Sequence, residues 1–347
     1  MQKTIRYKEL TNEQIRQMVD SEQAFQSWRE TRDEFLHGYE GSYKGTMKWK
    51  TRASGQYLYR ILNGVEKSLG ARSPETEKIK ADYTKARNRL RERLKTQEQK
   101  LQHLARINRA LRLARVPNIA ARILARLDEA GLLGSHLTVV GTNALFAYEA
   151  KAGVQIDSDV LATEDVDFLY DVRRHLKLVS GDIKRSGLMG ILKEVDDSFT
   201  RSKQTFRAAN KDGYLVDLIR PQDVDELRSK LKGQLGELDD DLIASPIEGL
   251  EWLLHAPRFE QVAIAQNGRP VLISTVDPRV YALHKIWLAQ NAPLRGAKKR
   301  RDLDQARIVA SLAIEGMGLS LDDKALSAFP VALVKEGKKL LGLPQKR

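Results

Sequence analysis

The chain has 347 residues, a formal net charge of +13 at pH 7 and no cysteine. Disulfides, thiolate metal sites and cysteine nucleophiles are therefore excluded, and the length predicts two or three structural units. The opening MQKTIRYKEL lacks the apolar core of a secretory signal, and no run approaches the roughly 20 apolar residues of a membrane span, so we expect a soluble cytoplasmic protein.

The N-terminal third predicts helix and a small hairpin. Residues 1–37 look helical, with Thr11 and Gln14 spaced as in a capping box. In the stretch 38–60, glycines punctuate basic and aromatic residues, and Ser54-Gly55 is suited to a turn between two strands. Such a mixture can stack bases and hold phosphates, but aromatic side chains that pack on neighbouring helices explain it as well.

Residues 74–115 predict a long helix with an apolar stripe. Leu90, Leu94, Leu101, Leu104 and Leu111 follow three- and four-residue steps, which Gln97 and Asn108 interrupt. The stripe fits a helical hairpin, a short coiled coil or an arm lying on the main domain. In the coiled-coil case a homodimer would follow.

The positive charge is concentrated between residues 84 and 126. Thirteen Lys or Arg lie there against two acids, Glu92 and Glu98, so this segment carries most of the excess. A concentrated basic stripe suggests a polyanion partner, and RNA, such as a tRNA end, is our leading candidate. The alternative is a solvated helix face without a partner.

From Asn118 the pattern changes to alternating helices and strands. We expect helices at 118–131, 142–153 and 186–196, strands at 137–141 and 166–170, and hairpins at 205–219 and 260–274. The fold class is α/β (α+β), with a mixed sheet between helical flanks. The expected domains are 1–73 (helix and basic-aromatic hairpin), 74–117 (basic helical arm), 118–277 (core) and 278–347 (helical region).

Three features of the predicted core carry chemistry. Gly141 and Thr142 lie between a buried strand and a helix start, where backbone amides favour phosphate oxygens. Asp165 and Asp167 share one face of a strand, because successive side chains alternate. Asp217 stands inside a second apolar strand, and beside the first pair it would complete a three-carboxylate site for two divalent metal ions.

Together these motifs resemble the DNA polymerase β-type nucleotidyltransferase superfamily, over roughly residues 118–310. The closest likeness is to bacterial proteins of the abortive-infection and toxin-type branch, because PRVYALHKIWLAQ and KKRRDLDQARIV resemble its helical motifs. The resemblance implies a palm-like core and a cytoplasmic enzyme of the toxin–antitoxin type, with a cognate regulator as one partner.

The resemblance also implies an activity and roles for residues. A nucleoside monophosphate would pass from an NTP such as ATP to an acceptor hydroxyl, with release of pyrophosphate. Asp165, Asp167 and Asp217 would be catalytic and would hold two Mg²⁺ ions, with Mn²⁺ as a substitute. Gly141, Thr142 and Lys285 would bind the nucleotide, and Arg301, Asp302 and Asp304 would belong to the second helical motif.

Two alternatives remain open. Asp157 and Asp159 form a second Asp-x-Asp, to which the metal site would move if the strand register differed. The chain could also be a non-catalytic, nucleic-acid-binding regulator with the same fold, or a synthase of oligonucleotide second messengers.

Overall fold

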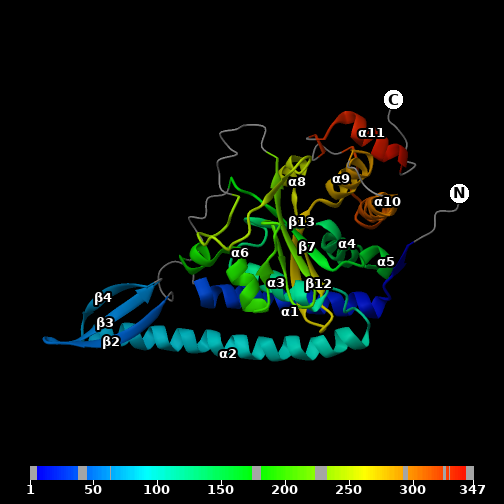
Figure 1. Ribbon diagram of the computed structural model, residues 1–347. Coiled ribbons are helices and arrows are strands. Elements are labelled where there is room, and N and C mark those ends of the chain that lie inside the picture. The colour runs from blue at the N-terminus through cyan, green and yellow to red at the C-terminus, as the bar shows by residue number, and fades with distance from the viewer. Residues whose placement is uncertain are drawn as a thin grey trace. The chain divides into compact units, whose positions relative to one another are not determined.

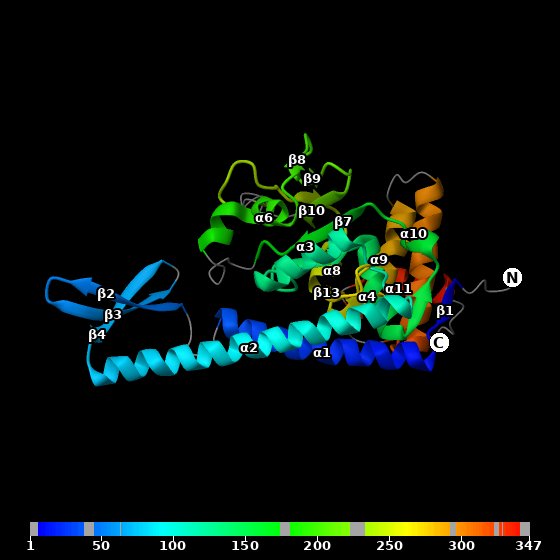
Figure 2. The ribbon, with the colours of Figure 1, turned by 90° about the horizontal axis from the view of Figure 1, so that it is seen from below.

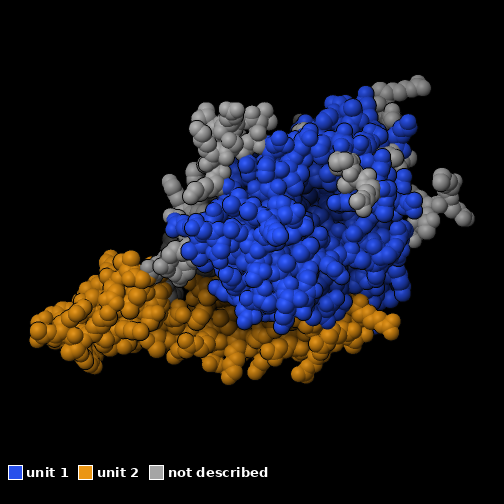
Figure 3. All heavy atoms as spheres, viewed as in Figure 1, with its two compact units in different colours: residues 1–15, 114–266, 271–347 blue, residues 16–113, 267–270 orange. Residues whose placement is uncertain are grey.

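The computed structural model describes residues 6–37, 45–62, 64–173, 181–222, 233–291, 296–322, 326–327 and 329–340 (Figure 1). The chain divides into two compact units (Figure 3). Unit 1 comprises residues 1–15, 114–266 and 271–347, and unit 2 comprises residues 16–113 and 267–270. Helices and a mixed sheet occur together, which confirms the α+β class.

Unit 2 combines a pair of long helices with a small sheet. Its elements are α1 (Asn12–His37), β2 (Thr46–Arg52), β3 (Gly55–Leu62), β4 (Val65–Ala71) and α2 (Pro74–Ala110). The three strands form one antiparallel sheet at the N-terminal end of α2 (Figures 1 and 2). The predicted turn at Ser54-Gly55 therefore exists, whereas residues 38–44 of the predicted hairpin region lie outside the described residues.

The polar residues that interrupt the leucine stripe of α2 join it to α1. Gln97 Nε2 donates to the Ser27 carbonyl at 3.1 Å, and Gln17 Nε2 donates to Asn108 Oδ1 at 2.9 Å. The later residue of α1 contacts the earlier residue of α2, so the two helices lie side by side and antiparallel (Figures 1 and 2). Gln97 and Asn108 are thus satisfied partners of α1 and not defects in the stripe.

The leucine stripe is buried within a single chain. Leu90, Leu101 and Leu104 are buried, so their spacing is no longer an argument for a homodimer. The helix also ends earlier than the predicted residue 115, since α2 stops at Ala110 and Arg112 has a φ of +56°. A positive φ at a non-glycine residue is incompatible with a continuing right-handed helix.

A six-stranded mixed sheet organises unit 1. Its strands, in spatial order, are β5 (Leu137–Val140), β7 (Asp165–Tyr170), β10 (Leu215–Pro221), β9 (Arg207–Ala209) and β8 (Thr200–Arg201), with β11 (Ser245–Ile247) also paired to β10. Strands β7 and β10 are parallel neighbours, and β5 and β9 flank them antiparallel. Val166, Phe168 and Val216 are fully buried on one face, so the aspartates that alternate with them share the opposite face.

Helices and two short strand pairs complete unit 1. The helical segments are α3 (Asn118–Glu129), η1 (Gly141–Ala144), α4 (Leu145–Ala152), α5 (Ser158–Leu161), α6 (Gly181–Val195), α8 (Glu251–His255), α9 (Pro278–Asn291), α10 (Gly296–Ser311), η3 (Leu312–Gly316) and α11 (Val331–Leu340). The strand pairs are β1 (Tyr7–Glu9) with β6 (Val154–Ile156), and β12 (Arg258–Ile264) with β13 (Pro270–Val276). Helix α9 packs against both α10 and α11.

Two features of the N-terminal segment and helices bear on the predictions. Residues 7–9 form a strand, so the expected uninterrupted helix over 1–37 is wrong at its start. The Thr11–Gln14 capping box is confirmed, because each residue's side chain accepts from the other's backbone amide, at 3.3 and 2.9 Å. None of the helices in the described ranges combines the length and apolar character needed to cross a membrane.

The buried imidazole of His284 makes the stability of the protein sensitive to acid. Its ring stacks on Trp287 with centroids 6.0 Å apart, and Nε2 has no hydrogen-bond partner in the described part of the chain. Burial, and then the charge of Lys285, lower the pKa of His284 to about 3. The unfolded chain binds this proton near pH 6.5, so the folded state loses stability as pH falls from 6.5 towards 3.

We therefore expect His284→Phe to remove part of the acid sensitivity. The wild-type imidazole destabilises the fold by about 2 kcal/mol between pH 6.5 and 5. Urea unfolding of both proteins at these two pH values measures the difference. Equal losses in wild type and variant would show that His284 takes up its proton in the folded state.

Candidate functional site

The three predicted aspartates meet on one face of the sheet. Asp217 on β10 is the direct register partner of Asp167 on the parallel strand β7, and Asp165 lies two residues earlier on β7. Direct partners point to the same face, so all three carboxylates share it. The alternation of polar and apolar residues along both strands produces this arrangement, and the apolar members bury the other face.

Gly141 brings the backbone up against one of these carboxylates. It follows Val140, the partner of Asp167 on β5, and has a φ of +67°. A Cβ atom at this position would lie 2.2 Å from Asp167 Oδ2, far inside contact distance. Only glycine satisfies both the left-handed conformation and the close approach. Gly141 thus lies beside Asp167.

The charge of Asp167 is costly in this environment. Burial, then the neighbouring charges of Asp165 and Asp217, raise the pKa of Asp167 to about 7. Lys285 and Lys298 act in the opposite direction and lower it. A cation bound beside Asp167 would offset both the loss of solvation on burial and the repulsion from Asp165 and Asp217.

Asp217 already has a cationic partner. Arg207 on β9 is its register partner, and the guanidinium donates through Nε to Oδ1 at 2.7 Å and through Nη2 to Oδ2 at 2.5 Å. The carboxylate is 8% exposed and the arginine side chain 30%. The two parallel hydrogen bonds make this a bidentate ion pair, which is stronger than hydrogen bonds between neutral groups. It occupies both oxygen atoms of the third aspartate.

Further hydrogen bonds position the β7 and η1 residues. The Thr163 hydroxyl donates to Asp165 Oδ1, and Asn143 Nδ2 donates to the Asp165 carbonyl at 2.6 Å. The hydroxyl of Thr142 accepts from Arg301 Nη2 at 3.1 Å, which links η1 to α10. Thr142 is therefore held by α10, in addition to the phosphate role predicted for it.

Lys285 reaches the same region from α9. Its Nζ donates to Asp302 Oδ1 at 2.7 Å, and both side chains are largely buried, at 12% and 5% exposed. The charge of Lys285 lowers the pKa of Asp167, which with Asp165 and Asp217 forms what we call the carboxylate face. Arg301 and Asp302, grouped by the sequence with a second helical motif, thus hold Thr142 and Lys285 respectively.

The second Asp-x-Asp pair lies elsewhere in unit 1. Asp157 precedes the short helix α5 and Asp159 lies within it, and both are paired with Arg6, which also contacts Asp304. Their side chains are 51% and 68% exposed. They are not part of the strand face that carries Asp165, Asp167 and Asp217.

Comparison with known protein families supplies the context for this geometry. Residues 118–330, more than half of the chain, match a family described as nucleotidyltransferase. The chain belongs to this nucleotidyltransferase family. The core of the enzyme thus coincides with the segment that carries the carboxylate face. Comparisons with curated proteins and with solved structures gave no match.

Nucleotidyltransferases generally use divalent metal ions, and the donor set here suits them in part. Carboxylate oxygens are the ligands that hard cations prefer. The raised pKa of Asp167 indicates that additional positive charge would stabilise its ionised form. Yet within the described ranges no group of three or more acidic or histidine side chains is arranged to hold a metal ion. Both oxygens of Asp217 accept hydrogen bonds from Arg207, and Oδ1 of Asp165 accepts one from Thr163.

The sequence interpretation missed Arg207 and Tyr214 of this nucleotidyltransferase. The charges of Asp165 and Asp167 raise the pKa of the buried Tyr214 phenol further, after the larger effect of burial, so the ring lies close to them. A signal for Arg207 existed, because a hairpin turning at Lys211-Asp212-Gly213 pairs residue 207 with residue 217. No comparable periodic signal pointed to Tyr214.

Proposed function

We propose that this nucleotidyltransferase moves a nucleoside monophosphate from an NTP to an acceptor hydroxyl in a Mg²⁺-dependent reaction. The observation that carries the proposal is the register of Asp217 against Asp167, with Asp165 on the same face and Gly141 in contact. Three carboxylates beside a glycine-marked backbone turn suit a triphosphate and its cations. RNA is the proposed class of acceptor, and the toxin-type branch of the superfamily is the proposed affiliation.

The side chains have separate proposed roles. Asp165 and Asp167 would hold the cations through their open oxygens, and Asp217 would join them after Arg207 turns away. The amides near Gly141 would bind phosphate oxygens, and Lys285 would offset charge on the departing pyrophosphate. Two divalent ions, when bound there, would supply positive charge for the attacking oxygen and the leaving group.

The basic segment 84–126 supports an RNA acceptor only in its first part. Arg115 pairs with Glu149, Arg122 donates to the Val195 carbonyl, and Arg126 pairs with Glu129 and Glu194. These three arginines therefore already bind other groups of unit 1. On α2, by contrast, Lys85 and Arg89 are exposed. The proposed contact with RNA therefore narrows to the part of α2 that carries Lys85 and Arg89.

Labelled NTPs test the proposal. The full-length protein is incubated with each of the four NTPs, Mg²⁺ and cell RNA, and label transfer and pyrophosphate release are followed. We expect transfer that EDTA abolishes. No transfer and no pyrophosphate with any NTP, across RNA, protein and small-molecule acceptors, would contradict the proposal. Oligonucleotides formed from NTP alone would instead assign the enzyme to second-messenger synthesis.

Replacement of Arg207 tests its role as the resident counter-ion. In Arg207→Gln the three carboxylates lose their only two-point cation in the described structure, so we expect the metal-free protein to lose about 3 kcal/mol of stability. Added Mg²⁺ should then raise the melting temperature of the variant more than that of wild type, because the ion replaces the lost charge.

Arg201→Gln is the matched control for this replacement. Arg201 bonds the backbone carbonyls of Asp239 and Asp241 and no carboxylate of the site. Its loss should lower the melting temperature without changing the response to Mg²⁺. Thermal unfolding with MgCl₂ and with EDTA measures both variants, and an equal Mg²⁺ response of Arg207→Gln and wild type would refute the role of Arg207.

A further inference from the structure

One face of the small sheet in unit 2 pairs tyrosines with basic residues. Lys48 on β2 is the direct partner of Tyr59 on β3, and Lys50 is the partner of Tyr57. Direct partners in an antiparallel sheet share a face, and Arg52, two residues after Lys50, shares it too. We call these five residues, Lys48, Lys50, Arg52, Tyr57 and Tyr59, the tyrosine face.

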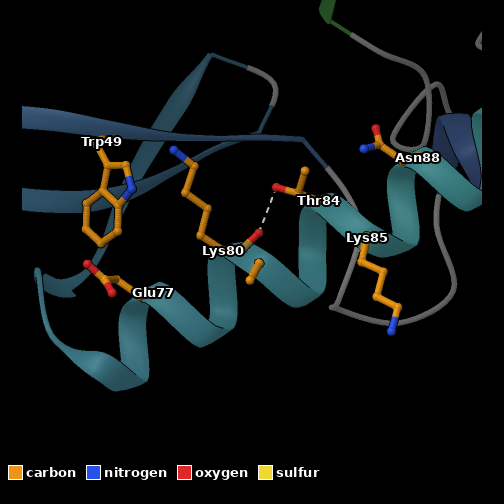
Figure 4. A pocket seen from close by; sticks show the side chains of 7 residues that line it. Trp49, Glu77, Lys80, Thr84, Lys85 and Asn88 are labelled. Atoms are coloured by element: carbon orange, nitrogen blue, oxygen red, sulfur yellow. Dashed lines mark hydrogen bonds between the residues drawn. The ribbon is translucent and has the colours of Figure 1, made fainter.

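The opposite face of the sheet is the one that packs on α2. Leu58 is fully buried there, and its partner Trp49 lies against Glu77 and Lys80 of the helix (Figure 4). The tyrosine face points the other way. Lys48 and Arg52 are exposed, and both tyrosines are half-buried with part of each side chain accessible.

The cations of the tyrosine face already contact an aromatic ring. Lys50 Nζ lies 5.6 Å and the Arg52 guanidinium carbon 5.7 Å from the centroid of the Tyr59 ring. The single acid in the three strands, Glu66, pairs with Lys50, which leaves Lys48 and Arg52 to act on a partner. Tyr59 has Arg52 over its ring and Lys48 as its cross-strand partner, so it is suited to a ligand with both a π-face and negative charge.

Further basic residues lie along α2, which packs on the other face of the sheet. Lys85, Arg89 and Arg93 follow four-residue steps on one side of the helix, and all three are exposed. Lys80 and Lys85 also line, together with Trp49, a hollow of about 520 Å³ (Figure 4). Arg72 and Lys80 lie over that ring, with centroid distances of 5.4 and 5.5 Å.

We propose that the tyrosine face of the small sheet binds single-stranded nucleic acid. Unpaired bases would stack on Tyr59 and Tyr57, and the phosphates would lie along Lys48 and Arg52. Duplexes are a poor match, because their bases are already stacked and their edges alone are accessible. The binding belongs to unit 2 and does not depend on the proposed transfer reaction, so it can be tested without turnover.

Fluorescence anisotropy of a labelled single-stranded RNA, titrated with the full-length protein in EDTA, tests the proposal. Tyr59→Ser removes the ring and should weaken binding on the order of 10-fold or more, whereas Tyr59→Phe keeps it and should bind as wild type does. A single-stranded DNA of the same sequence should also bind, and the matching duplex should bind more weakly.

The salt dependence tests the cations separately. Lys48→Gln/Arg52→Gln should lower the slope of log K against log salt by about 1.4, because each phosphate contact with a single strand contributes about 0.7. Lys100→Gln/Arg106→Gln removes the same charge from two exposed positions in the C-terminal half of α2 and should leave the slope unchanged.

Three results would overturn the proposal. These are equal affinities of Tyr59→Ser and Tyr59→Phe, equal salt slopes of the two charge variants, and tighter binding of duplex or of acidic lipid vesicles than of single strands. If Tyr59→Ser does not fold, the proposal is tested by chemical acetylation of lysines in the wild-type protein with and without RNA. Bound RNA should protect Lys48 from acetylation more than it protects Lys100, and equal protection of the two lysines would contradict the proposed site.

Discussion

Asp167→Asn is expected to abolish nucleotidyl transfer while it stabilises the metal-free protein. Asparagine keeps the shape of the side chain but loses the charge that would hold a cation. Loss of several kcal/mol of transition-state stabilisation corresponds to a fall in kcat/KM of about 10³-fold or more. A residue with a purely structural role would lower activity and stability together.

The stability effect has the opposite sign because the charge is unfavourable in the fold. Burial and the neighbouring carboxylates raise the pKa of Asp167 to about 7, so its ionised form costs about 4 kcal/mol. Urea unfolding in EDTA at pH 8 should therefore show a more stable variant. Lower stability than wild type would contradict the account of the carboxylate face.

Asp159→Asn is the control for Asp167→Asn. It changes the alternative Asp-x-Asp pair, whose carboxylate is exposed and bound by Arg6. We expect activity within about twofold of wild type, because a single exposed ion pair contributes at most about 1 kcal/mol. If Asp159→Asn were inactive and Asp167→Asn active, the metal site would have to be moved to the 157/159 pair.

Gly141→Ala is expected to have the second-largest effect on activity. The added methyl carbon would meet Asp167 Oδ2 at 2.2 Å, so the carboxylate or the η1 backbone has to move. A displacement of about 1 Å at a reacting centre can cost on the order of 10²-fold in rate. Initial rates and thermal unfolding of the same preparation separate this effect from unfolding.

Gly131→Ala provides the matched control. Gly131 has a φ of +69°, close to the +67° of Gly141, but a Cβ there would meet nothing within 4 Å. Both variants should lose about 1–2 kcal/mol of stability through the left-handed backbone. Only Gly141→Ala should lose activity beyond that. Equal activity of the two variants would show that the close approach to Asp167 has no catalytic importance.

The strand positions of the carboxylates could be predicted because they depend on local alternation. Asp165 and Asp167 had to share a face once the stretch TEDVDFLYD was read as strand-like, and the face of Asp217 followed from the alternation in its own strand. Their meeting depended on β7 and β10 being parallel neighbours in register, which alternation alone does not specify. The resemblance to a known superfamily supplied that expectation.

The partners of the site residues were beyond sequence reasoning for a physical reason. Thr142 receives a hydrogen bond from Arg301, 159 residues away, and Lys285 pairs with Asp302 across two packed helices. Such contacts depend on tertiary packing, which has no short-range pattern. Gln97 and Asn108 show the same limit, because they read as flaws in a leucine stripe until α1 is placed beside α2.

A crystal structure of the protein with Mn²⁺ and a non-hydrolysable NTP tests the central claim most directly. The anomalous signal of Mn²⁺ should lie between Asp165 and Asp167, with Arg207 turned away from Asp217 and the phosphates at the amides of Gly141 and Thr142. Manganese at Asp157 and Asp159, or a bound nucleotide with no cation on the 165/167/217 face, would contradict the account.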